Sequence, residues 1–151
     1  MFFPDKNTRF QESRITMKTE DLTVVAQKLE SALGSVLQSL DPDALDAALG
    51  MIQWKRIPTD IEDDDSMAKL LGLASLPPGS ELVVITDASF VYGVGAFILV
   101  AAEFGQFQLW YRDRFGERVF SGCDVIFWAR MDKRVWLVHH EGVYASVQLE
   151  A

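Results

Sequence analysis

The chain has 151 residues, of which 49% are hydrophobic and 24% are charged, and its formal net charge is −8 at pH 7. One domain typically has about 100–200 residues, so we expect a single domain over residues 1–151. The composition is that of an ordinary globular protein and excludes collagen-like, coiled-coil and wholly disordered classes. Because nucleic acids and anionic membranes repel a negatively charged protein, the acidity argues against both as direct partners.

Residues 1–18 are predicted to form an arm, because they are polar and show no helical or strand periodicity. They contain no positive segment followed by a long apolar core, so no signal peptide is expected. Residues 88–102, the most apolar stretch, fall short of the roughly 20 residues that a membrane helix needs. Cys123 is the only cysteine, which excludes an intramolecular disulfide and favours a reducing compartment. We therefore expect a cytoplasmic protein without a membrane span.

Residues 19–76 are predicted to be the helical part of the domain. Over residues 22–40, apolar side chains recur at steps of three and four, which is typical of one long amphipathic helix. Thr19 is the expected N-cap of this helix. A second helix is expected to begin with Asp41 and Pro42, because aspartate caps helices well and proline fits their first position. The second helix is expected to end at Gly50 or within residues 54–58. A short third helix is expected to have Asp65 or Ser66 as its N-cap and to end near Gly72.

Residues 79–151 are predicted to be the β part, after the break at Pro77 and Pro78. Segments rich in β-branched and aromatic residues alternate there with short separators, which allow hairpins and leave no room for parallel crossovers. We predict an antiparallel meander of five to seven strands, in an α+β fold whose two long helices and one short helix pack against the sheet. The expected strands are residues 81–86, 94–103, 106–112, 118–120, 124–130, 134–140 and 143–149.

No group of residues in the sequence predicts a catalytic site, a cofactor or a metal. Gly93 and Gly95 begin a pattern like the dinucleotide-binding fingerprint, but Ile98 stands where the third glycine belongs. A bend or close packing within a strand is therefore favoured at these glycines. His139 and His140 are neighbours on a predicted strand, so their rings should point to opposite faces rather than to one metal. We expect one ring to be half-buried and the other to be exposed at a hairpin end.

Residues 41–65 carry eight acidic and two basic side chains, and therefore a net charge of −6 out of the total of −8. Repulsion among so many like charges destabilises a compact fold, which favours a functional reason for them, namely attraction of a cationic partner. For residues 62–65 the favoured interpretation is a solvated loop that leads into a helix cap. A recognition surface comes next and a divalent-cation site last, because the ligand spacing and the sharp-turn glycine of a calcium loop are missing. Trp54 is a candidate anchor, although packing over the helix–sheet core is the favoured role. The predicted partner-binding residues are Asp41, Asp43, Asp46, Trp54, Asp60, Glu62, Asp63, Asp64 and Asp65.

Small size, high acidity and the absence of catalytic motifs resemble, in general character only, the bacterial immunity proteins, which neutralise a cognate toxin inside the producing cell. That resemblance implies a basic protein partner, such as a nuclease whose active site accepts carboxylates in place of phosphates. The second hypothesis is a secretion chaperone or adaptor that holds an unfolded effector, a class that is also small, acidic and α+β. The third is an enzyme or a sheet pocket for a small ligand, for which His139, Cys123 and Asp87 are the candidate residues.

Overall fold

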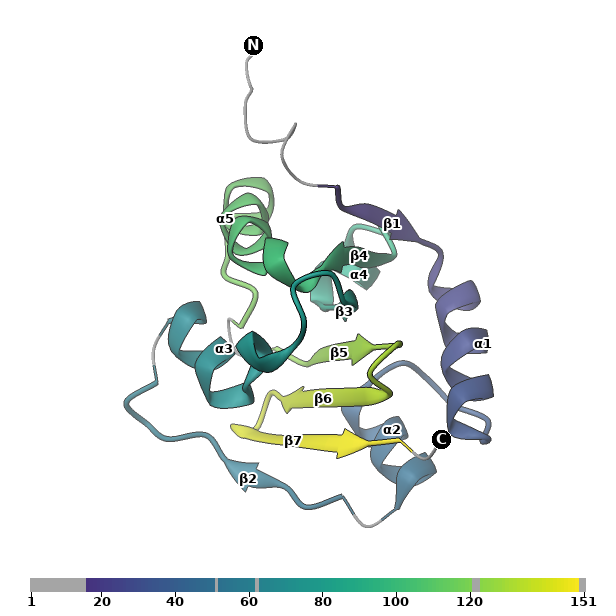
Figure 1. Ribbon diagram of the computed structural model, residues 1–151. Coiled ribbons are helices and arrows are strands. Elements are labelled where there is room, and N and C mark those ends of the chain that lie inside the picture. The colour runs from purple at the N-terminus through teal and green to yellow at the C-terminus, as the bar shows by residue number, and fades with distance from the viewer. Residues whose placement is uncertain (1–15, 51, 62, 121–122, 150–151) are drawn as a thin grey trace.

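The central strands are apolar at almost every position, so both faces of the sheet that they form must be covered. In the computed structural model, which describes residues 16–50, 52–61, 63–120 and 123–149, nearly all side chains are buried in β3 (Glu81–Ile85), β5 (Val125–Ala129) and β6 (Arg134–His139). Such runs are typical of strands that are packed on two sides. Helices lie over both faces of the sheet, which gives three layers (Figure 1).

The described strands form one seven-stranded sheet in which every neighbouring pair is antiparallel. Its order is β1-β4-β3-β5-β6-β7-β2, and β5, β6 and β7 are the consecutive hairpins of a meander. The other strands are β1 (Lys18–Glu20), β2 (Lys55–Arg56), β4 (Ala96–Val100) and β7 (Val143–Gln148). The predicted α+β class and the predicted antiparallel sheet are confirmed.

Two short strands from the N-terminal half form the edges of this sheet. Lys18 of β1 pairs with Ile98 of β4, and Lys55 of β2 pairs with Tyr144 of β7. Both are additions to the predicted meander, because Lys18 belongs to the expected arm and Lys55 to the expected helical part. Residues 1–15 of the predicted arm lie outside the described residues.

One face of the sheet is covered by α1 (Leu22–Leu33) and α2 (Pro42–Leu49). The buried side chains of Val25, Leu29 and Leu45 form a core with apolar residues of the central strands. None of the described helices, on either face, is long and apolar enough to cross a membrane.

The opposite face is covered by α3 (Asp64–Leu71), α4 (Asp87–Val91) and α5 (Phe104–Phe115). A buried hydrogen bond ties α3 to the sheet, because the indole Nε1 of Trp136 on β6 donates to the carbonyl oxygen of Leu71 at 2.8 Å. Most buried tryptophan N–H groups in proteins have such a partner.

The first helix is shorter than expected at both ends. Asp21, rather than Thr19, is its N-cap, and the Asp21 carboxylate accepts a hydrogen bond from the backbone N–H of Thr23 at 2.8 Å. The helix ends at Gly34, whose φ of 72° is left-handed. Glycine adopts this conformation without the steric cost that a side chain brings. The expected continuation of the helix to residue 40 is therefore wrong.

The other two predicted helices are found, with one changed cap. α2 lies between Asp41 and Gly50, as expected. α3 ends at Gly72, as expected, but begins earlier than predicted, because Asp63 rather than Asp65 is its N-cap.

The predicted strand over residues 106–112 is wrong, because these residues lie in α5. Phe107 and Tyr111 are fully buried against the sheet, whereas Leu109, which a strand would place on the same face, is 57% exposed. Residues 118–120, also predicted as a strand, form a loop. The C-terminal half is therefore a sheet with two inserted helices rather than a continuous meander.

Candidate functional site

The three acidic residues near α2 lie in different environments. The carboxylate of Asp41 caps the helix and accepts a hydrogen bond from the backbone N–H of Ala44 at 2.8 Å. The carboxylate of Asp46 accepts one from the indole Nε1 of Trp54 at 3.1 Å. Asp43, by contrast, has a side chain that is 77% exposed. Asp43 is therefore the one of the three that presents most of its carboxylate to solvent.

Trp54 is half-buried over the core on the α1 and α2 face. Besides its bond to Asp46, its ring makes an edge contact with His139, with the ring centroids 5.9 Å apart. This environment matches the expected packing role for Trp54 more closely than that of an exposed anchor.

Two of the acidic residues near α3 also have structural roles. Asp63 accepts a hydrogen bond from the backbone N–H of Ser66 at 2.7 Å, and its bonds to Ser66 lower the pKa of Asp63. Asp64 accepts hydrogen bonds from the backbone N–H groups of Val119 and Phe120, each at 3.2 Å. Burial raises the pKa of Asp64 and outweighs those bonds, since it disfavours the charged form. Asp64 therefore fastens the loop after α5 to the start of α3.

Asp60 and Asp65 are exposed, and Glu62 lies outside the described residues. The acidic side chains do not gather in one cluster, because α2 packs on one face of the sheet and α3 on the other.

His139 lies where β6 ends, and only 8% of it is exposed. Its Nδ1 accepts a hydrogen bond from the backbone N–H of Glu141 at 3.1 Å, and its Nε2 lies 3.2 Å from Oδ1 of Asp43. An acceptor role for Nδ1 places the proton of the neutral ring on Nε2. His139 therefore donates to Asp43 and joins the end of β6 to α2.

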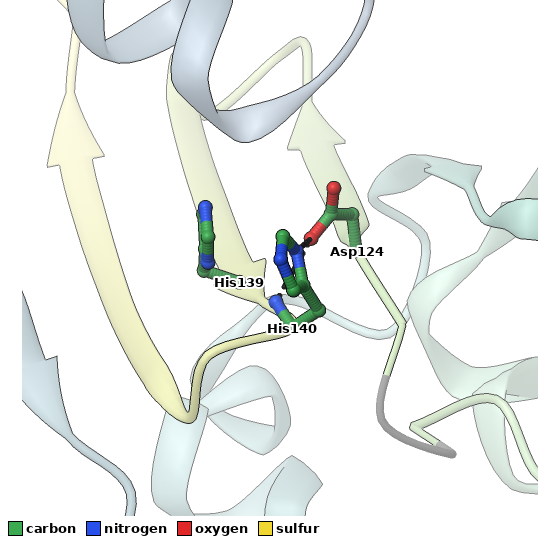
Figure 2. A group of neighbouring side chains, drawn as sticks. All are labelled: Asp124, His139 and His140. Carbon is green, nitrogen blue, oxygen red and sulfur yellow. Dashed lines mark hydrogen bonds and ion pairs between the residues drawn. The ribbon is translucent and has the colours of Figure 1, made fainter.

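His140 is exposed and follows the last residue of β6 (Figure 2). Its ring Nδ1 and its backbone N–H both lie 2.8 Å from Oδ1 of Asp124. The hydrogen bond to Asp124 is the main cause that raises the pKa of His140 above its usual value. The ring is therefore protonated over a wider pH range than that of an isolated histidine.

The two histidine rings stack on each other, with centroids 4.3 Å apart and planes inclined by 25°. The prediction that the rings point to opposite faces is wrong, because His140 has left the strand. Each of Asp124, His139 and His140 offers one possible metal-ligand atom, and these atoms lie within 4.8 Å of one another. Nδ1 of His140 and Oδ1 of Asp124 are engaged with each other at 2.8 Å, however, so a cation bound through these two atoms would have to replace their hydrogen bond. In this arrangement Asp124 and His140 form a hydrogen-bonded link, and the ring of His139 stacks on that of His140, rather than an assembled metal centre being present among these described residues.

A cavity of about 420 Å³ opens beside this link, and His139, His140, Asp63 and Cys123 are among the residues that line it. Cys123 is half-buried there. His139 touches Asp43 near α2 and also borders this cavity, which Asp63 near α3 lines as well. Sequence reasoning could not have found this relationship, because the residues involved lie on different elements. Comparison with known proteins gave no significant match to a protein family, to a curated protein or to a solved structure.

Proposed function

We propose that this chain binds a basic toxin and neutralises it, in the manner of a bacterial immunity protein. The observation that carries the proposal is the uneven charge, because residues 41–65 hold a net −6 of the total of −8. Asp43, Asp60 and Asp65 of this segment are exposed. Exposed carboxylates act on a cationic surface over long distances, so they are suited to attracting a partner.

A nuclease is a suitable class of partner for such a surface. Its active site must attract phosphates, so it presents positive charge to which carboxylates can bind instead. Complementary charge mainly raises the association rate, while buried contacts at the interface set the dissociation rate. The proposal therefore requires both an acidic surface and an apolar contact.

The test is affinity capture of the partner from the host cell with the full tagged chain, followed by mass spectrometry. We expect a basic protein, encoded next to this chain, whose expression alone stops growth and whose co-expression with the chain restores growth. A captured protein that leaves growth unaffected would contradict the proposal.

The state of the partner in the complex separates this function from that of a secretion chaperone. An immunity protein leaves its toxin folded, whereas a chaperone keeps its effector extended. Hydrogen exchange of the captured partner distinguishes the two, because amides in folded elements exchange slowly. Fast exchange throughout the bound partner would favour the chaperone.

A further inference from the structure

We propose that a groove between α2 and α4 is the surface that holds the partner, and that it accepts an apolar side chain flanked by lysine or arginine. This inference rests on the proposed function, because it names the contact that retains a basic partner after the acidic surface has attracted it. The residues that define the α2–α4 groove are Leu40, Asp41, Asp87, Phe90, Val91 and Asp124.

Two large apolar side chains stand next to each other on the surface at this groove. Phe90 is 51% exposed and Val91 is 73% exposed. Tyr92 is exposed as well, but its ring already stacks on that of Phe115, with centroids 5.1 Å apart. Contiguous apolar surface is unfavourable in water and marks interaction sites, whereas single exposed apolar residues are ordinary. Because Phe90 and Val91 line the same groove, they offer neighbouring apolar surface that a partner can cover.

The direction of these two side chains is fixed by the start of α4. The hydroxyl of Thr86 accepts a hydrogen bond from the backbone N–H of Ala88 at 3.2 Å, and that of Ser89 accepts one from the backbone N–H of Thr86 at 3.1 Å. Ala88 and Ser89 are buried, so the next turn presents Phe90 and Val91 outward. A surface that is rigid before binding loses less conformational entropy when a partner docks.

A cavity of about 340 Å³ lies beside Phe90 and Val91. Its apolar wall includes Leu40, Ile85 and Ile126, which come from the loop before α2 and from β3 and β5. A cavity of about 150 Å³ is enough to hold benzene. The groove therefore has room for a side chain of the size of leucine or phenylalanine.

The charge around this cavity determines which residues of the partner can flank the inserted apolar side chain. Asp41, Asp87 and Asp124 border it, and no lysine or arginine is among the described residues that line it. Asp41 is held by its capping bond, and Asp124 is held by its hydrogen bond to His140. Asp41 and Asp87 still leave the rim negative, so lysine or arginine beside the inserted residue would be complementary.

The binding test uses a short capped peptide that alternates arginine and leucine, added to the full isotopically labelled chain and followed by NMR. We expect the largest shifts at the amides of Asp87, Phe90 and Val91. A peptide with glutamate in place of arginine, or with serine in place of leucine, should bind at least about tenfold more weakly.

The double variant Phe90→Ser with Val91→Ser should lower the affinity for the peptide at least about tenfold. Leu109→Ser, at a similarly exposed apolar position on α5, is the matched control and should leave it unchanged. Because both sites are exposed, circular dichroism should show parent-like folding. Asp87→Ser tests the charge separately and should weaken binding without removing the apolar contact. Shifts confined to other surfaces, or parent-like affinity in the double variant, would overturn the proposal.

Two further outcomes separate this inference from the proposed function. If the captured toxin binds the double variant as tightly as the parent, the groove is wrong while the proposed function stands. If the parent chain is a dimer that the double variant dissociates, the occupant is a second copy and the proposed docking of a basic partner is overturned.

Discussion

His139 and Asp43 lie 96 positions apart in the sequence, yet Nε2 of the histidine is 3.2 Å from Oδ1 of the carboxylate. The contact is asymmetric, because the histidine is buried and the aspartate is exposed. It connects the end of β6 to α2, and so joins the central sheet to the acidic segment of residues 41–65.

This asymmetry predicts unequal effects on stability. His139→Ala should lower the free energy of unfolding by about 1–3 kcal/mol, because it removes a packed ring and leaves the backbone N–H of Glu141 without its acceptor. Asp43→Ala should lower it by less than about 1 kcal/mol, since its carboxylate is 77% exposed and water can replace it as the acceptor of the hydrogen bond from His139. Urea denaturation measures both. Equal losses would show that the hydrogen bond to Asp43, rather than the buried ring, carries the stabilisation.

The pair of His140 and Asp124 predicts a pH dependence. Asp124 raises the pKa of His140 in the folded protein above the ordinary value of 6.5. The stabilisation from the protonated ring is therefore fully present below about pH 6.5 and is lost as the pH rises through the folded-state pKa. An NMR titration should place the pKa of His140 above 6.5 in the parent and closer to that value in Asp124→Asn. An unchanged pKa in this variant would contradict the role of Asp124.

Asp64 should matter for stability far more than its neighbour in the same acidic run. Asp64→Ala leaves the backbone N–H groups of Val119 and Phe120 without their acceptor, at a cost of about 1–3 kcal/mol in the free energy of unfolding. Asp65→Ala, at an exposed position, is the matched control and should change it by less than about 0.5 kcal/mol. Chemical denaturation of the two variants provides the comparison. Similar values would mean that the loop after α5 does not depend on Asp64.

Gly95 is predicted to be intolerant of any side chain. Its φ is +86°, and an added Cβ would overlap the backbone carbonyl oxygen of Glu20 at the end of β1. Gly95→Ala should therefore lower the free energy of unfolding by more than about 2 kcal/mol. Gly93→Ala has a similar positive φ but open space around it, so it should cost only about 1 kcal/mol. Thermal unfolding distinguishes them, and equal shifts would exclude the clash with Glu20.

The proposed electrostatic attraction predicts a kinetic effect of the exposed carboxylates. Asp60→Ser with Asp65→Ser should slow association with the captured toxin by about three- to tenfold at low salt and flatten its salt dependence, with little effect on dissociation. The control is the double variant Asp113→Ser with Glu117→Ser. It removes the same charge from exposed positions at the end of α5 and just after it. Stopped-flow mixing measures the rates. Equal slowing by both variants would assign the effect to net charge rather than to residues 60–65.

The sequence pattern predicted the sheet well where apolar runs are bounded by turns, as in β5, β6 and β7. It failed at α5, because Phe107 and Tyr111 satisfy both strand alternation and helix periodicity. The deciding residue is Leu109, which strand alternation places on the same face as Phe107 and Tyr111 and which the helix exposes. The absence of β-branched residues from 104–115 was the available signal for a helix.

The candidate site was less predictable than the fold. The charge of residues 41–65 is visible in the sequence, but the contacts of each carboxylate involve residues that are distant from it in the sequence. Asp64 binds the backbone of residues 119–120, and Asp46 binds the indole of Trp54. Phe90 and Val91 belong to an apolar stretch that appeared ordinary, and only the turn of α4 shows that they face solvent.

The two edge strands have a consequence for how the chain is made. Lys18 pairs with Ile98 and Lys55 pairs with Tyr144, so the outermost strands are synthesised before the strands against which they rest. Until the later strands emerge from the ribosome, the early segments have no ladder to join, and an incomplete sheet offers open edges to other chains. We therefore expect the helical and β parts to fold together as one cooperative unit, only after β7 has been synthesised.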